Sequence, residues 1–349
     1  MPVLNSYGVS AADGVKCVDM KRLILLLVAA VATSTGQDSS PTKSTLASAI
    51  FREATQCIHS VKPSQRGYAV SELAEAQAEA GLIPQAVATV SLSDRDRDQL
   101  LVTIANIEVR KGRYGSAMAI VAGIDRQQQD QVRQEIGIKQ AERGDVDAAQ
   151  DTAAAMLTDY YRETVLYFAA LELQRQGANV RAQALASTFK YPDHFLPDPA
   201  TAEPNFDWRV NRPLPDDFES IPQPPSLYSQ AVQQLRAGHL TDAISRIASD
   251  SNPADASSNF ARLAEDAAEM GNLDAALQLL AKVHVSGADY EDGYAEGTLR
   301  PIGKLWASMD AGAALTWART RPTPRQRALA LAGVGQGVAG SENPATKLN

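Results

Sequence analysis

The sequence predicts an all-α protein, an α-solenoid of stacked antiparallel helix pairs with one long proline-rich insertion. Three observations favour this fold class. The chain of 349 residues is 44% hydrophobic but only 6% aromatic, so its apolar side chains are mostly those of closely packed helices and not of a β-branched and aromatic sheet core. Glycines recur at a nearly constant interval, and small residues flank each of them at fixed distances. Such self-similarity is typical of repeat architectures.

The repeating unit is marked by a glycine between two helices. These glycines are Gly81, Gly112, Gly144, Gly177, Gly238 and Gly271, and they are 31 to 33 residues apart except for one interval of 61. Five positions later come Ala86, Ala117, Ala149, Ala182, Ala243 and Ala276. Seven positions earlier come Ala74, Ala105, Gly137, Ala170, Ala231 and Ala264.

Helix physics explains this spacing. Glycine can adopt the left-handed conformation that ends a helix, and Asp145 and Asn272, each directly after its glycine, are predicted to cap the second helices. Small residues on both sides of the turn let two antiparallel helices approach closely. One such pair cannot bury its apolar face alone, so we expect the pairs to stack.

The unit resembles a tetratricopeptide repeat, with its small residue in the first helix, its turn glycine, an aromatic or apolar residue two positions later and its alanine five positions later. The resemblance covers about residues 65–190 and 226–285. The chain departs from the family in its shorter units and in lacking a proline between them. The resemblance implies that the first helices line a concave face.

Candidate partner-binding residues lie on that face, ten and six positions before each glycine. They are Ser71 and Glu75, Val102 and Asn106, Gln134 and Ile138, Tyr167 and Leu171, Tyr228 and Val232, and Ala261 and Glu265. The middle of the set is apolar and aromatic, and we expect Val102, Asn106, Gln134, Ile138, Tyr167, Leu171 and Tyr228 to contact a peptide with hydrophobic anchors. The family clamps a carboxylate with Lys and Asn at these positions, but only Asn106 matches, so that ligand is not carried over.

The first 36 residues form a predicted leader. Lys21 and Arg22 precede an apolar run, 23–32, that ends in a small-x-small cleavage pattern near Ala32. These features are typical of a secretory signal with its true start at Met20, although a buried helix is the alternative. The signal predicts an exported protein, periplasmic or secreted, and the mature chain is expected to contain no integral membrane segment.

The remaining chain divides at changes of composition. A disordered spacer, 37–43, precedes N-terminal repeats at 44–189, and C-terminal repeats at 226–340 precede a disordered tail at 341–349. Between the repeats, 190–225 is rich in proline and contains aromatic residues. Trp208 belongs to this insertion and is another candidate partner-binding residue. The insertion is either a linker or an arm that lies across the solenoid groove.

Weaker copies of the unit extend the array at both ends. Ala49 replaces the glycine in a leading half-unit, 44–60, and Met309 marks a degenerate unit. Gly340 marks a last unit, whose second helix is interrupted by Pro344 and the chain end. The glycine-rich stretch AGVGQGVAG, 332–340, occupies the first-helix position of this unit, and we interpret it as a site of close helix packing, not as a phosphate-binding loop.

The sequence predicts no catalytic, cofactor-binding or metal-binding residue. None of the four histidines has the spacing of a metal-ligand pair, and Cys57 lies in an apolar helical pattern that favours burial. The net charge of −8 argues against a nucleic-acid partner.

We therefore expect a non-enzymatic scaffold that binds a protein or peptide and needs no cofactor. An alternative is an enzyme or ligand-binding protein whose site is formed by 190–225 and the groove. A self-associating structural scaffold is a third possibility.

Overall fold

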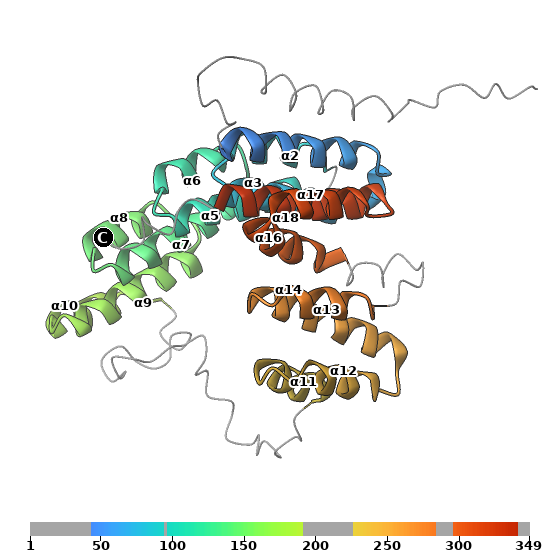
Figure 1. Ribbon diagram of the computed structural model, residues 1–349. Helices are drawn as coiled ribbons and strands as arrows, with labels where there is room; N and C mark the ends of the chain where they lie inside the picture. Colours follow the sequence, from blue (N-terminus) through green and yellow to red (C-terminus); the bar gives the residue numbers. More distant parts are fainter. Residues whose placement is uncertain (1–42, 94–95, 191–225, 284–295, 341–349) are drawn as a thin grey trace, which may run out of the picture.

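The computed structural model describes residues 43–93, 96–190, 226–283 and 296–340, and this part of the chain is all helical (Figure 1). The leader, Trp208 with the rest of 191–225, and the tail lie outside the described residues. The described residues contain sixteen α-helices and one 3-10 turn, with no strand. The prediction of an all-α protein is confirmed for them.

The helices follow the predicted units closely. Those of the N-terminal part are α2 (Lys43–His59), η1 (Pro63–Gln65), α3 (Gly67–Glu79), α4 (Ile83–Val90), α5 (Arg97–Arg110), α6 (Tyr114–Ile120), α7 (Arg126–Glu142), α8 (Val146–Ala154), α9 (Asp159–Arg175) and α10 (Asn179–Ala186). Those of the C-terminal part are α11 (Leu227–Arg236), α12 (Leu240–Ala248), α13 (Pro253–Glu269), α14 (Leu273–Leu280), α16 (Leu299–Met309), α17 (Ala311–Arg319) and α18 (Pro324–Gly340).

The six glycines that mark the repeating units, called the register glycines below, all adopt the left-handed conformation, with φ between +74° and +84°. At the first of these turns, the backbone N–H of Leu82 donates to the carbonyl of Gln77 at 2.8 Å, which satisfies an otherwise unpaired carbonyl at the helix end. Asp145 and Asn272 accept hydrogen bonds from backbone N–H groups in the first turns of α8 and α14. The predicted turns and caps are therefore confirmed.

The small flanking residues lie inside the structure, as expected. Ala86, Ala117 and Ala149 have no exposed surface. In two of the pairs, the same side-chain hydrogen bond joins the two helices: Thr89 donates to Gln77, and Thr152 donates to Gln140, each at 2.7 Å. Cys57 is half-buried and packs against the same core.

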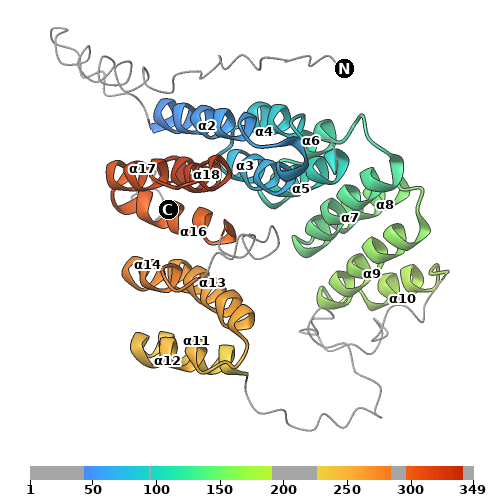
Figure 2. The same ribbon diagram turned by 90° about the vertical axis from the view of Figure 1, so that its right-hand side faces the viewer.

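Neighbouring helices pack in a regular order. The first helix of each pair contacts its second helix, and both contact the first helix of the next pair; for example, α7 contacts α8, and both contact α9. The order α3 to α10 repeats this pattern in the N-terminal part, and the order α11 to α18 repeats it in the C-terminal part. Figure 2 shows α9 and α10 at one end of the helical array and α11 and α12 at the other.

The two parts meet at α18, which is the most enclosed helix of the described chain. It packs against α16 and α17 on one side and against α2 and α3 on the other, and residues 328–338 are all buried. The contacts of α2 with α18 and α3 are those of a second helix in a pair. The leading half-unit and the last, interrupted unit therefore complete each other, a pairing that the sequence did not predict.

Glycines make this close packing possible. A Cβ atom at Gly333 or Gly337 would lie 2.1 or 2.3 Å from a backbone carbonyl oxygen of α16, and a Cβ at Gly335 would lie 2.8 Å from the ring of Phe51 in α2. Real Cβ atoms do not tolerate such distances. The interpretation of the glycine-rich stretch as a helix-packing element is confirmed.

The turn geometry predicts that any side chain at a register glycine lowers the free energy of unfolding. Gly81→Ala introduces no steric contact, because nothing lies within 4 Å of the added Cβ, but it forces alanine to φ +79°. We expect a loss of about 1 kcal/mol in the free energy of unfolding, measured by urea denaturation. Gly115→Ala, inside α6 and also without close neighbours, is the control and should be neutral or stabilising. Equal effects of the two changes would contradict the left-handed turn.

The close contact between α16 and α18 predicts that two glycines of α18 differ in how well they tolerate a change to alanine. Gly333→Ala should lower the free energy of unfolding by about 1–3 kcal/mol or more, because its Cβ overlaps the carbonyl oxygen of Arg300. Gly340→Ala has no atom within 4 Å of its Cβ and should leave the melting temperature unchanged. Thermal unfolding followed by circular dichroism compares the two variants. If Gly333→Ala melts like the unmodified protein, the helices are farther apart than described.

Candidate partner-binding groove

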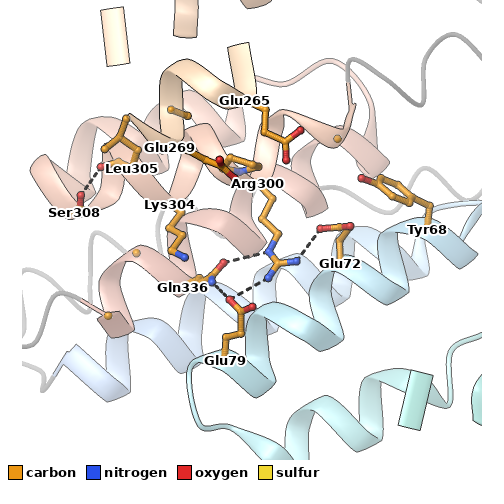
Figure 3. A pocket seen from close by; sticks show the side chains of 15 residues that line it. Tyr68, Glu72, Glu79, Glu265, Glu269, Arg300, Lys304, Leu305, Ser308 and Gln336 are labelled. Carbon is orange, nitrogen blue, oxygen red and sulfur yellow. Dashed lines mark hydrogen bonds and ion pairs between the residues drawn. The ribbon is translucent and has the colours of Figure 1, made fainter. Parts of the chain in front are cut away.

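A groove of about 690 Å³ opens where the two parts of the chain meet (Figure 3). Side chains from α3 and α13 line it on two sides, and α16 and α18 lie between them. All four are first helices of their pairs. Gly297, Gly337 and Gly340 also line the groove, and their missing side chains leave space there.

Arg300 is the central side chain of the groove. It begins on α16, passes across α18 and reaches three glutamates of α3, with its Nη1 at 2.8 Å from Glu72 Oε2 and 3.4 Å from Glu75 Oε2. Its Nη2 lies 3.2 Å from Glu79 Oε2. The Nε of Arg300 donates to Gln336 Oε1 on α18 at 3.1 Å, and the Gln336 amide donates in turn to Glu79.

These contacts keep Arg300 charged. Burial disfavours the charged guanidinium, since only 13% of its side-chain surface is exposed, but the hydrogen bond and charge of Glu72 and the charges of Glu79 and Glu75 raise the pKa of Arg300 above its usual value. One guanidinium thus holds three carboxylates from successive turns of a helix that is not a sequence neighbour.

Negative charge exceeds positive charge in the groove. Besides the α3 glutamates, Glu265 and Glu269 of α13 line it, and its only lining cations among the described residues are Arg300 and Lys304. Glu265 and Glu269 both keep a large part of their surface exposed to solvent. Neither forms a hydrogen bond or an ion pair with another described residue, whereas the glutamates of α3 share Arg300.

The excess of negative charge affects the ionisation of individual groups. Partial burial and the nearby carboxylates of Glu269, Asp266 and Glu72 raise the pKa of Glu265. Burial, together with the charge of Glu72 and a hydrogen bond to it, raises the pKa of Tyr68. An added cation would therefore be stabilised in this groove.

The residues predicted to bind a partner lie elsewhere and differ in accessibility. Val102, Ile138 and Tyr167 are buried, and the first two belong to hydrophobic core clusters, so their side chains are covered in this structure. Burial has a simple cause: neighbouring first helices pack side by side, and part of the face predicted to be open is their contact surface. None of these three lines the groove.

The other predicted residues are partly accessible. Gln134, Leu171, Asn106 and Tyr228 are half-buried, and Asn106 Oδ1 is buried without a hydrogen-bond partner among the described residues. The hydroxyl of Tyr228 donates to Asp266, while Arg262 lies over its ring at 4.1 Å; burial and this hydrogen bond raise the pKa of Tyr228 to about 12. Their role in partner binding stays a prediction.

The positions ten and six residues before each turn glycine, which the sequence analysis selected, include only part of the groove. Glu75 and Glu265 occupy the positions six residues before a turn glycine, and one contacts Arg300 while the other lines the groove. Arg300 and Lys304 were missed because their unit has no turn glycine, and Gln336 was missed because it lies four positions before Gly340 and not six or ten. Nothing local places α16 opposite α3.

Comparisons of the chain with protein-family models, curated proteins and solved structures find no match. Across the described ranges, no three His, Cys, Asp or Glu side chains are grouped as the ligands of a metal ion. No helix among those residues combines the length and hydrophobicity needed to cross a membrane.

The raised pKa of Glu265 predicts a pH-dependent effect. The folded protein holds a proton on this carboxyl to higher pH than the unfolded chain does, so its ionisation costs stability as the pH rises above the ordinary glutamate value of 4.5. Glu265→Gln should raise the free energy of unfolding at pH 7, and the gain should disappear well below pH 4.5. Urea denaturation across this range measures the difference.

Asp151→Asn, on the exposed side of α8, is the control for removing one negative charge from an acidic chain. It should give a smaller gain at pH 7 than Glu265→Gln. A Glu265→Gln gain that is no larger, or one that persists unchanged at low pH, would show that the groove carboxylates do not repel one another.

Proposed function

We propose that the chain is an exported, non-enzymatic scaffold that binds a protein partner, and that the groove receives a lysine- or arginine-bearing segment of that partner. The observation that carries the proposal is the excess of carboxylates in an open groove, with Glu265 and Glu269 unpaired among the described residues. A flexible cationic segment supplies the missing charge and can enter a groove of this size.

The scaffold in this proposal is a TPR-like solenoid of stacked helix pairs. Two observations support it: the six left-handed glycines at the turns and the repeated contact order in which both helices of a pair meet the first helix of the next. Repeat arrays of this kind present extended surfaces to partners, since each pair adds the same face to the one before.

Export is proposed from the sequence of the leader alone. The basic pair Lys21 and Arg22, the apolar run 23–32 and the small residues before Ala32 have the order of a secretory signal. The partner would then be a periplasmic or secreted protein.

The arrangement of charges favours an extended cationic segment over a single small cation. The unpaired carboxylates lie on α13, and the carboxylates that share Arg300 lie on α3, on the other side of α16 and α18. A chain with charges at intervals can contact Glu265, Glu269 and the exposed Glu79 together, whereas one ion cannot. Lys304, which is exposed, lies between these walls and would face the backbone carbonyls of such a segment.

Binding of a labelled ten-residue peptide with alternating lysine and alanine tests the proposal by fluorescence anisotropy. We expect binding that weakens as salt is raised, because the contacts are ionic and exposed. The double change Glu265→Gln with Glu269→Gln should weaken binding about tenfold, which corresponds to about 1.4 kcal/mol.

The matched control removes the same number of charges elsewhere. Asp151→Asn with Asp242→Asn changes exposed residues of α8 and α12 and should leave the peptide affinity within about twofold. A peptide that binds both double variants equally, or a glutamate-alanine peptide that binds as well as the lysine peptide, would overturn the groove as the binding site.

A further inference from the structure

We infer that the groove exists only while residues 43–190 and 226–340 are docked through α18, so that a ligand in the groove and this docking stabilise each other. The inference rests on the proposed function and names a means by which the same site is controlled. The two walls of the groove, α3 and α13, come from different parts of the chain. Glu72 and Arg300, which meet in the groove at 2.8 Å, are 228 residues apart in sequence.

The docking surface is a helix pair that neither part can form alone. The C-terminal part supplies α18, which follows α17 after a short turn, and the N-terminal part supplies α2. α18 packs extensively against both α2 and α3. Phe51 of α2 lies against Gly335 at the centre of this contact, and both residues 328–338 and Phe51 are buried.

Ion pairs connect the two parts at two separate places. In the groove, Arg300 binds the glutamates of α3. Outside it, Arg319 of α17 binds Glu53 of α2 through two hydrogen bonds, of 2.8 and 2.7 Å. The second pair has no part in the groove, so docking and groove chemistry can be changed independently.

Docking also brings like charges together. Glu72 comes from the N-terminal part and Glu265 from the C-terminal part, and the charge of Glu72 contributes to the raised pKa of Glu265. This repulsion opposes docking, and the charge of Arg262, on the same helix as Glu265, offsets only part of it. A cationic segment between the walls reduces the repulsion further and contacts both parts at once.

Linkage then fixes the direction of the effect. If the two parts separate, the wall of α3 leaves the wall of α13, and the ligand loses one set of contacts. A ligand that binds the docked state better than the separated state shifts the population toward docking. By reciprocity, a change that lowers the population of the docked state weakens ligand binding.

The test uses the full chain with a specific protease site inserted between Pro204 and Asn205. After purification and cleavage, the two pieces should remain together on size exclusion at micromolar concentration, because the contacts of α18 with α2 and α3 hold them. The alternating lysine-alanine peptide at saturation should slow the exchange of a labelled C-terminal piece with unlabelled cleaved protein at least fivefold.

Two variants separate the joint from the groove. In the cleaved protein, Arg319→Gln should speed exchange without the peptide, and the peptide should still slow exchange by a similar factor. Glu265→Gln with Glu269→Gln should abolish most of the slowing by the peptide. Gly115→Ala, in α6 and without close neighbours, lies outside both the joint and the groove and should change neither rate.

The outcomes can be told apart. Pieces that separate at micromolar concentration as soon as the chain is cut would overturn the inference about the joint. A peptide that binds the uncut protein but leaves the exchange rate unchanged would overturn the coupling and leave the proposed function standing. A peptide that does not bind the uncut protein at all would overturn the proposed function, and the coupling with it.

Discussion

The structure depends on the close approach of α18 to the helices around it. Interhelical distances are normally 8–10 Å because side chains stand between the axes, and a helix enclosed on all sides needs small or apolar residues around its whole circumference. The glycines at 333, 335 and 337 meet this need toward α16 and α2. Without them, α18 could pack against one part of the chain but not against both, and the contact order would be interrupted at its centre.

The groove is a consequence of the same close approach. The backbone of α16 touches α18, so a long side chain on α16 can cross α18 and reach α3. Arg300 does this, and its planar guanidinium suits simultaneous contact with several carboxylates better than an ammonium group would. Because the ion pairs are partly buried, the cost of removing their charges from water offsets much of their attraction.

The carboxylates of the groove form two sets that differ in their partners. The carboxylates of α3 are engaged by Arg300 and Gln336, and they hold the two parts of the chain in register. The carboxylates of α13 project into the groove without such partners among the described residues. In the proposed function, a cationic ligand can bind and leave without breaking the ion pairs of Arg300, and its affinity should follow ionic strength.

The sequence by itself determined the helix pairs, because their signals are local: the turns at Gly81, Gly144 and Gly271 and the caps Asp145 and Asn272 act within a few residues of their own positions. The sequence also determined which positions carry the small residues that are buried between helices. It did not determine which helix packs against each of them. Only the tertiary structure decided that α2 completes the pair begun by α18, that Val102 and Ile138 face adjacent helices and are covered, and that Arg300 meets Glu72. The periodicity of apolar residues predicts which face of a helix is buried. It does not predict which helix packs on that face, since any helix with a complementary face could do so.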